Sequence, residues 1–385
     1  MKIIELSYHD KKVDWSIESI TFKPFNLLVG ASGVGKTRIL QAIWGLKKVV
    51  GGDSLNGVKW EISFESGPGK EYWWRGEFET VSPEFKLDER AKIDEAKEVA
   101  LGYEELRLNG QVLVSRTKEE VKFHGTKTPK LSSTESILSL FREEDDIKPA
   151  CRGFSRIFYS KSFDPQSISS LLFLFELDPK RLVSEYLDLD SLRESNENIR
   201  SKLFVCYKNR FPVFESIRNT FIDIFPIVTD LRYAPLEKEE LNNIPALLRE
   251  QPVLQIKEEG IDRWIPQTRV SSGMYRTLMH LSELFLCSDG TVVLIDEFEN
   301  SLGINCINDL TMELLSADRD LQFIITSHHP YIINNISFDH WKLITRQAGK
   351  VFARDASELS LGKSKHDAFL QLINLEQYRT GIELR

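Results

Sequence analysis

The sequence predicts an α/β fold with an N-terminal antiparallel β region and an inserted, mainly helical lobe. Residues 2–30 have the pattern of short strands, and the pattern from Ser132 to about Leu248 is mostly helical. Near the other end, Thr291–Ile295 and Gln322–Thr326 are continuous apolar runs, the form that strands take when both faces of their sheet are covered. Two such strands joined by a helix make a βαβ unit, which places the last third in the α/β class.

The N-terminal region supplies short strands and one helix. Apolar residues alternate in the strand segments and recur at helical spacing in the helix. We expect strands at Ile3–Tyr8, Ser16–Phe22 and Phe25–Val29, a helix over Thr37–Lys48, and a strand pair at Val58–Phe64 and Glu71–Phe78 around the turn Ser66-Gly67-Pro68-Gly69.

The remaining segments alternate between the two periodicities. We expect a charged helix within 79–102, strands at Glu105–Val114, Val121–His124 and Arg156–Tyr159, and a crossover helix at Ser301–Ala317. The resulting domain prediction has three parts. They are an N-terminal half over residues 1–80, an inserted lobe over 81–260, and a C-terminal half over 261–385.

Size, charge and cysteine content restrict the partners. The 385 residues are 41% hydrophobic and 28% charged, so the chain can bury a substantial core. A net charge of -8 excludes a general attraction to phosphate backbones, and any nucleic-acid contact must come from a local patch. The four cysteines are far apart and lack zinc-ligand spacing, which favours buried free thiols in a reducing cytosol.

The start of the sequence and its hydropathy predict a cytoplasmic protein without a membrane contact. Residues 1–8 alternate like a strand and lack the apolar core of a signal peptide. No apolar run approaches the roughly 18 to 20 residues that a membrane helix needs.

A phosphate-binding loop follows the third strand. The segment from Gly30 to Thr37, Gly30-Ala31-Ser32-Gly33-Val34-Gly35-Lys36-Thr37, fits G-x-x-x-x-G-K-[ST] between an apolar strand and a helix. Gly30, Ser32, Gly33 and Gly35 allow backbone N–H groups to surround phosphates, and the helix N-terminus adds positive potential. Lys36 can reach the β and γ phosphates of ATP, and the Thr37 hydroxyl can bind Mg²⁺.

Two carboxylates end the apolar strand Val292–Ile295. Asp296 lies where a Walker B aspartate binds magnesium, and Glu297 can orient or deprotonate an attacking water. A second apolar strand ends in Thr326-Ser327-His328, and it should emerge on the same sheet edge after one crossover helix. His328 is therefore a candidate γ-phosphate sensor, and the next residue, His329, should turn away.

A helix start precedes Asp296 by about twenty-five residues. Val270-Ser271-Ser272-Gly273-Met274 opens a helix with apolar residues at helical spacing, and the simplest interpretation is an N-cap. Its N-terminus could also bind an anion. Such an anion would belong to a second subunit, because the helix start should point out from the surface and away from its own phosphate-binding loop.

The four motifs in this order resemble the ABC-like AAA-type ATPases of bacteria, a group related to SMC, RecF and OLD-family ATPases. Ser271-Ser272-Gly273-Met274 stands where transporters have L-S-G-G-Q, and Ile295-Asp296-Glu297-Phe298-Glu299-Asn300 follows. The resemblance covers both ends of the chain well and residues 80–260 loosely. It implies an ABC-type P-loop ATPase head that uses ATP and Mg²⁺. Many such proteins, including the Septu ATPase and its retron-associated relatives, belong to anti-phage defence systems.

The resemblance also implies a role for each motif residue. Lys36 would bind phosphate, Thr37 and Asp296 would bind magnesium, Glu297 would be the catalytic base, His328 would be the switch histidine, and Ser271 and Gly273 would contact the γ phosphate held by the opposite subunit. Two departures stand out. Asn300-Ser301-Leu302-Gly303 replaces the common turn that ends in His-Pro, and no clear Q-loop glutamine is found, with Gln166 in Phe163-Asp164-Pro165-Gln166 as a candidate.

Three functions can be weighed against each other. The first is a head-to-tail homodimer that switches a partner effector, such as a nuclease, in anti-phage defence. The second is a DNA-binding ATPase of the SMC or RecF type in repair, which would need a basic track such as residues 116–130, although such runs are usually a solvated hairpin. The third, an autonomous nuclease with a C-terminal Toprim domain, is not expected, because about fifty-seven residues follow His328 here and the acidic residues among them do not form a D-x-D pattern.

Overall fold

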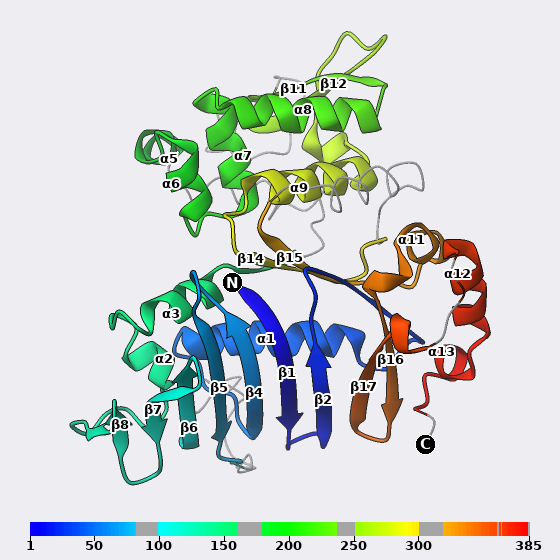
Figure 1. Cartoon of the computed structure of the whole chain (residues 1–385). Coiled ribbons are helices and arrows are strands. Elements are labelled where there is room, and N and C mark those ends of the chain that lie inside the picture. The colour runs from blue at the N-terminus through cyan, green and yellow to red at the C-terminus, as the bar shows by residue number, and fades with distance from the viewer. Residues whose placement is uncertain are drawn as a thin grey trace, which may run out of the picture. The chain divides into compact units, whose positions relative to one another are not determined.

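The computed structural model describes residues 1–81, 99–160, 179–236, 251–299, 319–359, 362 and 364–383 (Figure 1). The chain divides into two compact units. Unit 1 comprises Met1–Tyr159, Gly290–Glu297 and Asp320–Arg385, and unit 2 comprises Ser160–Asp289 and Phe298–Arg319. The division into residues 1–80, 81–260 and 261–385 stays a prediction of the sequence.

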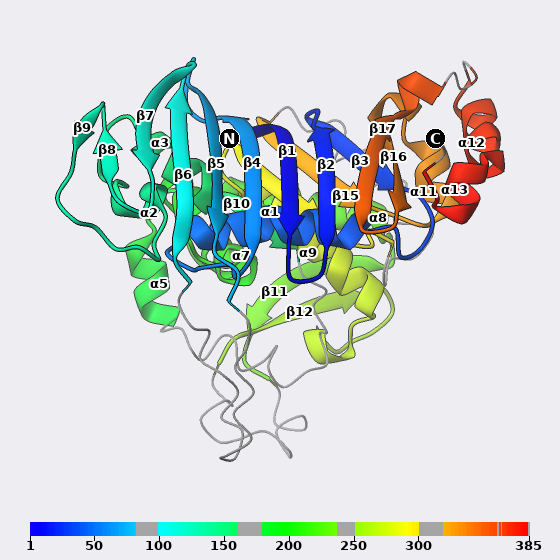
Figure 2. The same cartoon turned by 90° about the horizontal axis from the view of Figure 1, so that it is seen from below.

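Unit 1 contains a long mixed sheet. Its strands are β1 (Lys2–Asp10), β2 (Trp15–Thr21), β3 (Phe25–Val29), β4 (Val58–Glu65), β5 (Glu71–Phe78), β6 (Leu101–Leu108), β7 (Gln111–Arg116), β8 (Val121–Phe123), β9 (Thr126–Lys127), β10 (Ile157–Ser160), β14 (Thr291–Ile295), β15 (Leu321–Thr326), β16 (Trp341–Gln347) and β17 (Lys350–Asp355). The spatial order is β10-β14-β15-β3-β16-β17-β2-β1-β4-β5-β6-β7-β8-β9 (Figure 2). Neighbours in the run β14-β15-β3-β16 are parallel, and the run from β2 through β1 to β9 is antiparallel.

The two halves of this sheet differ in their burial pattern. Every residue of β3, β14 and β15 is buried, whereas β4 and β5 alternate between buried and more exposed positions. A strand covered on both faces needs continuous apolar residues, and a strand with one wet face needs alternation. The predicted N-terminal antiparallel region and the predicted buried parallel strands are therefore confirmed.

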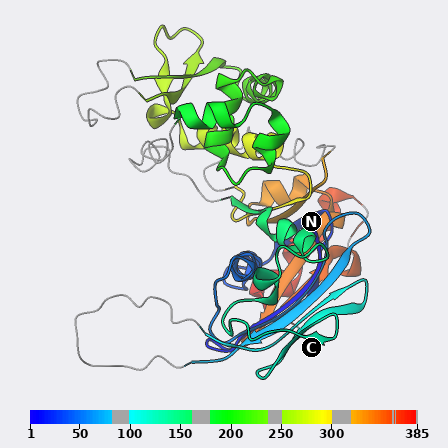
Figure 3. The same cartoon turned by 90° about the vertical axis from the view of Figure 1, so that its left-hand side faces the viewer.

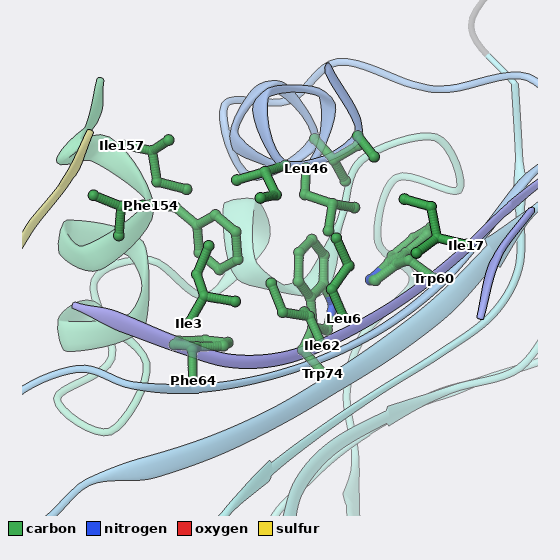
Figure 4. Packing of buried hydrophobic residues seen from close by; sticks show 14 of the residues in the cluster. Ile3, Leu6, Ile17, Leu46, Trp60, Ile62, Phe64, Trp74, Phe154 and Ile157 are labelled. Atoms are coloured by element: carbon green, nitrogen blue, oxygen red, sulfur yellow. The ribbon is translucent and has the colours of Figure 1, made fainter. Parts of the chain in front are cut away.

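Helix α1 (Lys36–Val50) packs on one face of the strand layer, which Figure 3 shows from the side. Its apolar residues, including Ile39, Ile43 and Leu46, join a core with side chains from the antiparallel strands (Figure 4). Trp60 and Trp74 lie at the centre of this core with ring centroids 5.0 Å apart. Burial of each large apolar side chain stabilises the fold by about 1.5–3 kcal/mol, so α1 fixes the phosphate-binding loop that precedes it.

A buried glutamine connects the start of β1 to β15. The Gln322 side chain accepts from the Ile3 N–H at 2.8 Å and donates to the Ile3 carbonyl at 2.9 Å. Gln322 is 2% exposed, and its amide satisfies backbone groups that the sheet ladder does not pair. This side chain therefore joins β1 of the antiparallel half to β15 of the parallel half, although these two strands are not neighbours in the sheet.

The other helices of unit 1 are short. They are α2 (Ile137–Leu140), α3 (Lys148–Ser155), α11 (Pro330–Asn335), α12 (Lys365–Asn374) and α13 (Glu376–Thr380), with 3₁₀ turns at Phe338–His340 and Ala356–Leu359. No helix of the described residues is long and apolar enough to cross a membrane.

Unit 2 is mainly helical, as predicted for the inserted lobe. Its described helices are α5 (Pro179–Glu185), α6 (Leu189–Glu194), α7 (Ile199–Lys208), α8 (Pro212–Ile224) and α9 (Ser272–Leu286), with a 3₁₀ turn at Gln267–Arg269. A small sheet of β11 (Val228–Ala234), β12 (Val253–Glu258) and β13 (Ile265–Pro266) accompanies them.

One strand prediction was wrong, and one segment of the stretch expected to be mostly helical is a strand. Residues 105–114, expected as one strand, form the end of β6, a turn and the start of β7. Asn109 and Gly110 have φ of 49° and 80°, the left-handed pair that a tight hairpin turn requires. Residues 228–234 lie in the stretch expected to be mostly helical, and they form β11, where Val228, Leu231 and Tyr233 are buried and the strand pairs with β12.

The described cysteines are reduced and shielded. Cys151 is half-buried, and Cys206 and Cys287 are buried. Burial raises the pKa of Cys151 to about 11 and the pKa values of Cys206 and Cys287 to about 12. For these three residues the predicted free thiols are confirmed, and Cys306 lies outside the described residues.

Candidate functional site

The loop between β3 and α1 adopts the backbone of a phosphate cradle. Gly30, Gly33 and Gly35 have φ of 143°, 80° and 111°, values that side-chain-bearing residues rarely adopt. At Gly30 a Cβ atom would also lie 2.4 Å from the carbonyl oxygen of Ile344. This glycine is therefore required both by its dihedral angle and by the neighbouring strand β16. Ser32 lies in the same loop and is exposed.

Lys36 begins α1 and folds back over the loop. Its ammonium donates to the carbonyl oxygens of Gly30 at 2.9 Å and Ala31 at 2.8 Å, and the residue is 5% exposed. A buried cation satisfied by carbonyl oxygens is held in one place. The positive charge is thus fixed within the loop, where an anion could meet it.

A hydroxyl–carboxylate network joins three neighbouring elements beside this loop. Asp296 follows β14, and its Oδ1 accepts from the Thr37 hydroxyl at 3.1 Å and from the Thr326 hydroxyl at 2.6 Å. The strands β14, β15 and β3 are parallel neighbours, so their carboxyl ends meet at one edge of the sheet. The structure therefore brings Thr37 and Asp296 together, although 259 residues separate them in the sequence.

Glu297 occupies a strained backbone position next to Asp296. Its φ is 48°, in the left-handed region that residues other than glycine seldom enter, and its side chain is exposed. The Glu297 N–H donates to the Thr326 hydroxyl at 2.8 Å, which holds this turn. Strain of this kind persists where surrounding contacts enforce it, and it concentrates at functional sites.

Thr326 and Tyr159 belong to this network, and sequence reasoning missed both. Thr326 is 1% exposed at the end of β15, where it is the one polar residue after an apolar run. Tyr159, in β10, hydrogen-bonds to Asp296, and burial together with that carboxylate raises the pKa of Tyr159 to about 12. Its phenol is thus neutral near pH 7 and donates to Asp296. The signal that could have identified them is a polar residue near the end of each strand beside β14, namely β10 and β15.

The two histidines after β15 have different environments. His328 is exposed, immediately after the buried Ser327. His329 is half-buried, and its Nδ1 accepts from the Tyr331 N–H at 3.2 Å, so it caps α11. His329 therefore stabilises the start of α11, whereas the assignment of His328 as the γ-phosphate sensor stays a prediction of the sequence.

Ser271 and Gly273 lie in unit 2 at the start of α9. The Ser271 hydroxyl accepts from the Met274 N–H at 3.2 Å, and Ser271 is exposed. The Gly273 carbonyl accepts from the Thr277 hydroxyl at 2.9 Å. The predicted N-cap is confirmed, and the exposed start of the helix leaves the first turn accessible.

Further along α9, buried polar groups form a chain. Arg276 Nε donates to His280 Nε2 at 3.2 Å, and His280 Nδ1 lies 2.9 Å from Glu283 Oε2. Glu283 Oε1 accepts from the Ser160 hydroxyl at 2.9 Å, and the Phe298 ring lies 5.8 Å from the His280 ring. Helix α9 therefore contacts Ser160 and Phe298, which directly follow Tyr159 and Glu297 in the sequence.

Two predicted features lie outside the described residues. These are Gln166, the candidate Q-loop residue, and Asn300–Gly303, the departure at the turn after the Walker B strand. The predicted crossover helix at 301–317 also lies outside them. The parallel register of β14 and β15 fits a crossover connection of that kind.

The donor atoms at this sheet edge fit Mg²⁺ bound together with phosphates. Thr37 and Asp296 offer hard oxygen ligands, which Mg²⁺ prefers. Among the residues described, no group of three or more His, Cys, Asp or Glu side chains could hold a metal ion. A cation here would complete its coordination with phosphate oxygens and water, as Mg²⁺ commonly does in nucleotide sites.

Three solved structures are similar to this chain. An SMC head bound to the C-winged helix domain of ScpA is 14% identical, with 92% of this chain and 98% of that chain covered and a TM-score of 0.51. An SMC head with an extended coiled coil from Pyrococcus furiosus, bound to the C-terminal domain of ScpA, is 15% identical (93% and 97% covered, TM-score 0.48). The SMC head domain from Thermotoga maritima is 14% identical (92% and 99% covered, TM-score 0.43).

The first of these matches shows the fold, an ABC-type ATPase head with mixed α/β structure. A comparison with curated proteins finds no match. The model of the family described as "AAA domain, putative AbiEii toxin, Type IV TA system" matches residues 25–334. Because this match spans most of the chain and the fold is that of an SMC head, the chain belongs to this family of AAA/ABC-type ATPases.

Proposed function

We propose that this chain binds and hydrolyses ATP with Mg²⁺ as a cytoplasmic, head-to-tail homodimer that controls a partner effector, such as a nuclease, in a bacterial anti-phage defence system. The observation that carries the ATPase part is the network of Thr37, Asp296, Thr326 and Glu297 beside the phosphate cradle. In this proposal Thr37 and Asp296 are the two oxygen ligands and Glu297 is the carboxylate, beside the phosphate-binding loop at one edge of the sheet.

Nucleotide binding would use the loop and α1. The N–H groups around Gly30, Ser32, Gly33 and Gly35 and the start of α1 favour negative charge, and Lys36 would neutralise the β and γ phosphates. Bound Mg²⁺ would offset charge that develops on the phosphates. Thr37 and Asp296 would hold that ion, and Thr326 and Tyr159 would orient Asp296 by donating to its carboxylate.

Hydrolysis would depend on Glu297 and His328. The exposed Glu297 carboxylate would accept a proton from the attacking water, and its left-handed backbone fixes the turn from which it projects. His328 would sense the γ phosphate from the end of the neighbouring strand. Slow turnover suits a switch, because the ATP-bound state must last long enough to be detected by a partner.

Pairing of two copies would complete each site. The capped, exposed N-terminus of α9 presents Ser271 and Gly273, and a helix N-terminus favours a phosphate group. A head-to-tail dimer would place this helix start against the γ phosphate held by the other copy. Both sites would then form together, as the symmetry of a dimer requires.

Control of an effector is supported by the family. Its description names a toxin and a type IV toxin–antitoxin system, in which a harmful activity must be kept in check. An ATPase head whose site depends on a second copy can report nucleotide state through dimerisation. The defence role and the effector follow from the resemblance to the ABC-like AAA-type ATPases of bacteria.

The alternative is a DNA-binding repair ATPase that uses residues 116–130, and this segment is poorly suited to it. Arg116 is 5% exposed and donates to the carbonyls of Glu135 and Ser132. Lys122 and Lys127 both pair with Glu120, at 2.5 and 3.5 Å. Three basic side chains of this segment are thus already engaged by other groups of the protein, which makes the segment a poor basic track for a duplex.

The test of hydrolysis replaces Glu297 by glutamine. Glu297→Gln keeps size and hydrogen bonding, so ATP should still bind with Mg²⁺ while turnover falls by about a hundredfold or more. The exposed Glu71→Gln in β5 is the matched control and should hydrolyse ATP at the parental rate. Parental turnover in Glu297→Gln would remove Glu297 as the base, and unchanged ATP affinity in Lys36→Ala would remove the cradle assignment.

The test of the composite site uses a crosslink between differently tagged copies. One copy carries Ser271→Cys and the other carries Arg38→Cys, at an exposed position of α1 near Lys36. A crosslinked pair with both tags should form when ATP is present and should be absent without it. Turnover by a strictly monomeric protein, or no mixed-tag product with ATP, would refute the head-to-tail dimer.

A further inference from the structure

Unit 2 contains a cleft that the ATPase motifs do not use. It has a volume of about 640 Å³ and lies among α7, α8, β11 and the segment before β13. Clefts of this size can enclose a small ligand or part of a longer one. All the residues that line it belong to unit 2 and to the described part of the chain.

Aromatic rings form much of the cleft wall. Tyr207, Phe211, Phe214 and Trp264 line it, and the Tyr207 and Phe214 rings pack with centroids 5.2 Å apart. Tyr207, Phe211 and Trp264 are only half-buried, so part of each ring faces the solvent. Partly exposed rings can stack on planar groups, as aromatic side chains do on the bases of single-stranded nucleic acids.

Cations stand directly beside these rings. Arg232 Cζ lies 4.0 Å from the centre of the Trp264 ring, and Lys208 Nζ lies 5.6 Å from the centre of the Tyr207 ring. Arg232 is oriented by a hydrogen bond of 2.9 Å from its Nε to Gln255 Oε1, and Gln255 is 1% exposed. The guanidinium is therefore positioned on Trp264 by a buried neutral partner.

The charge of the cleft is positive on balance. Four cationic side chains line it, Lys208, Arg210, Arg218 and Arg232, against two acidic ones, Glu215 and Asp230. Both acids pair with Arg218, at 2.6 and 3.5 Å. Within the described residues no acidic partner is recorded for the three other cations, so their charge is available to an anion.

Arg210 occupies a position where glycine is usual. It follows α7 with φ of 54°, and the Phe211 N–H donates to the Cys206 carbonyl at 2.9 Å, which closes the helix end. Glycine is the common residue at this left-handed position. An exposed arginine there carries backbone strain, and strain of this kind concentrates where a side chain has a function.

We propose that this cleft binds single-stranded nucleic acid, with bases against Tyr207 and Trp264 and the backbone phosphates beside Lys208, Arg210 and Arg232. Bases account for the half-buried rings, and phosphates account for the three cations without an acidic partner among the described residues. An acidic peptide would use the cations and leave the rings exposed, and an apolar ligand would leave the cations without a partner. A duplex hides its bases from stacking and offers the rings nothing. The proposal does not rest on ATP hydrolysis.

The test measures binding of a labelled oligodeoxythymidylate of about twelve nucleotides to the whole protein by fluorescence anisotropy. Loss of one stacking ring in Trp264→Ala should weaken binding by about tenfold or more. Arg210→Gln should also weaken it, and should reduce the slope of log affinity against log salt by about 0.7, the value for one phosphate contact on a single strand. Arg210 is exposed, so this variant should fold normally even if Trp264→Ala does not.

Arg142→Gln is the matched control, because it removes one exposed arginine of unit 1 and should leave affinity and salt slope unchanged. Several results would overturn the proposal. They are no binding of the oligomer, equal binding by Arg210→Gln and the parent, equal affinity for a duplex of the same length, and equally strong competition by thymidine monophosphate. The last two would show that a duplex surface or a mononucleotide site had been mistaken for a strand site.

Discussion

Thr326→Val tests whether one buried hydroxyl holds the candidate site together. Thr326 is 1% exposed, donates to Asp296 Oδ1 at 2.6 Å and accepts from the Glu297 N–H at 2.8 Å. Valine has the same shape and leaves no cavity, so the loss is confined to these two bonds. A bond to a charged group contributes about 1.5–3 kcal/mol, and the bond from the part-buried Glu297 N–H contributes about 0.5–1.5 kcal/mol. The free energy of unfolding should fall by roughly 2–4.5 kcal/mol.

The assay is urea unfolding together with ATP turnover. Thr345→Val is the matched control, because Thr345 is also 1% exposed and donates to a carboxylate, that of Glu383, outside the network. The control should lose stability through its single bond and keep its turnover and Mg²⁺ dependence. Thr326→Val should lose more stability and most of its turnover, because both Asp296 and Glu297 are released. Equal stability to the parent, or the same turnover as the control, would refute this reasoning.

Three further predictions concern the loop, the phenol and the thiols. Gly30→Ala should abolish ATP binding by calorimetry, since its Cβ would lie 2.4 Å from the Ile344 carbonyl oxygen, and retained affinity would contradict the cradle geometry. Tyr159→Phe should raise the Mg²⁺ concentration needed for half-maximal turnover, because Asp296 loses a donor; an unchanged requirement would argue against that contact. In a Cys306→Ser background the remaining thiols should resist a thiol reagent at about pH 8 until the protein unfolds. Their pKa values are raised in the folded state, so stability should fall as pH rises above about 8.5, where unfolded thiols ionise, and rapid labelling of native protein or a flat pH profile would contradict their burial.

The sequence was most informative where residue type and local backbone are tied together. The glycines of the loop and the apolar runs of β3, β14 and β15 predicted their own conformations, and parallel strands then placed Thr37 near Asp296. Residues that act through long-range contacts could not be identified in this way. Thr326 and Tyr159 are ordinary strand residues until the neighbouring strands are known.

The other differences between the predicted and the observed structure each have their own cause. Asn109-Gly110 is a typical hairpin turn. It was overlooked because polar and apolar residues alternate on both sides of it, so the whole segment fits the pattern of one strand. Strand β11 does not show a strand pattern because an irregularity between Val228 and Asp230 breaks its alternation, and pairing with β12, about two dozen residues away in the sequence, decides its conformation. The aromatic and basic cleft of unit 2 draws its residues from separate segments, so no run of sequence displays it.

The chain passes between the two units at Tyr159/Ser160, Asp289/Gly290, Glu297/Phe298 and Arg319/Asp320. Two of these crossings directly follow residues of the candidate site. On the far side of each, Ser160 and Phe298 are held by Glu283 and His280 of α9. Consecutive Cα atoms stay about 3.8 Å apart, so the positions of Ser160 and Phe298 limit where Tyr159 and Glu297 can lie. The helix that begins at Ser271 is thus linked to Tyr159 and to Glu297 by one side-chain contact and one peptide bond in each case.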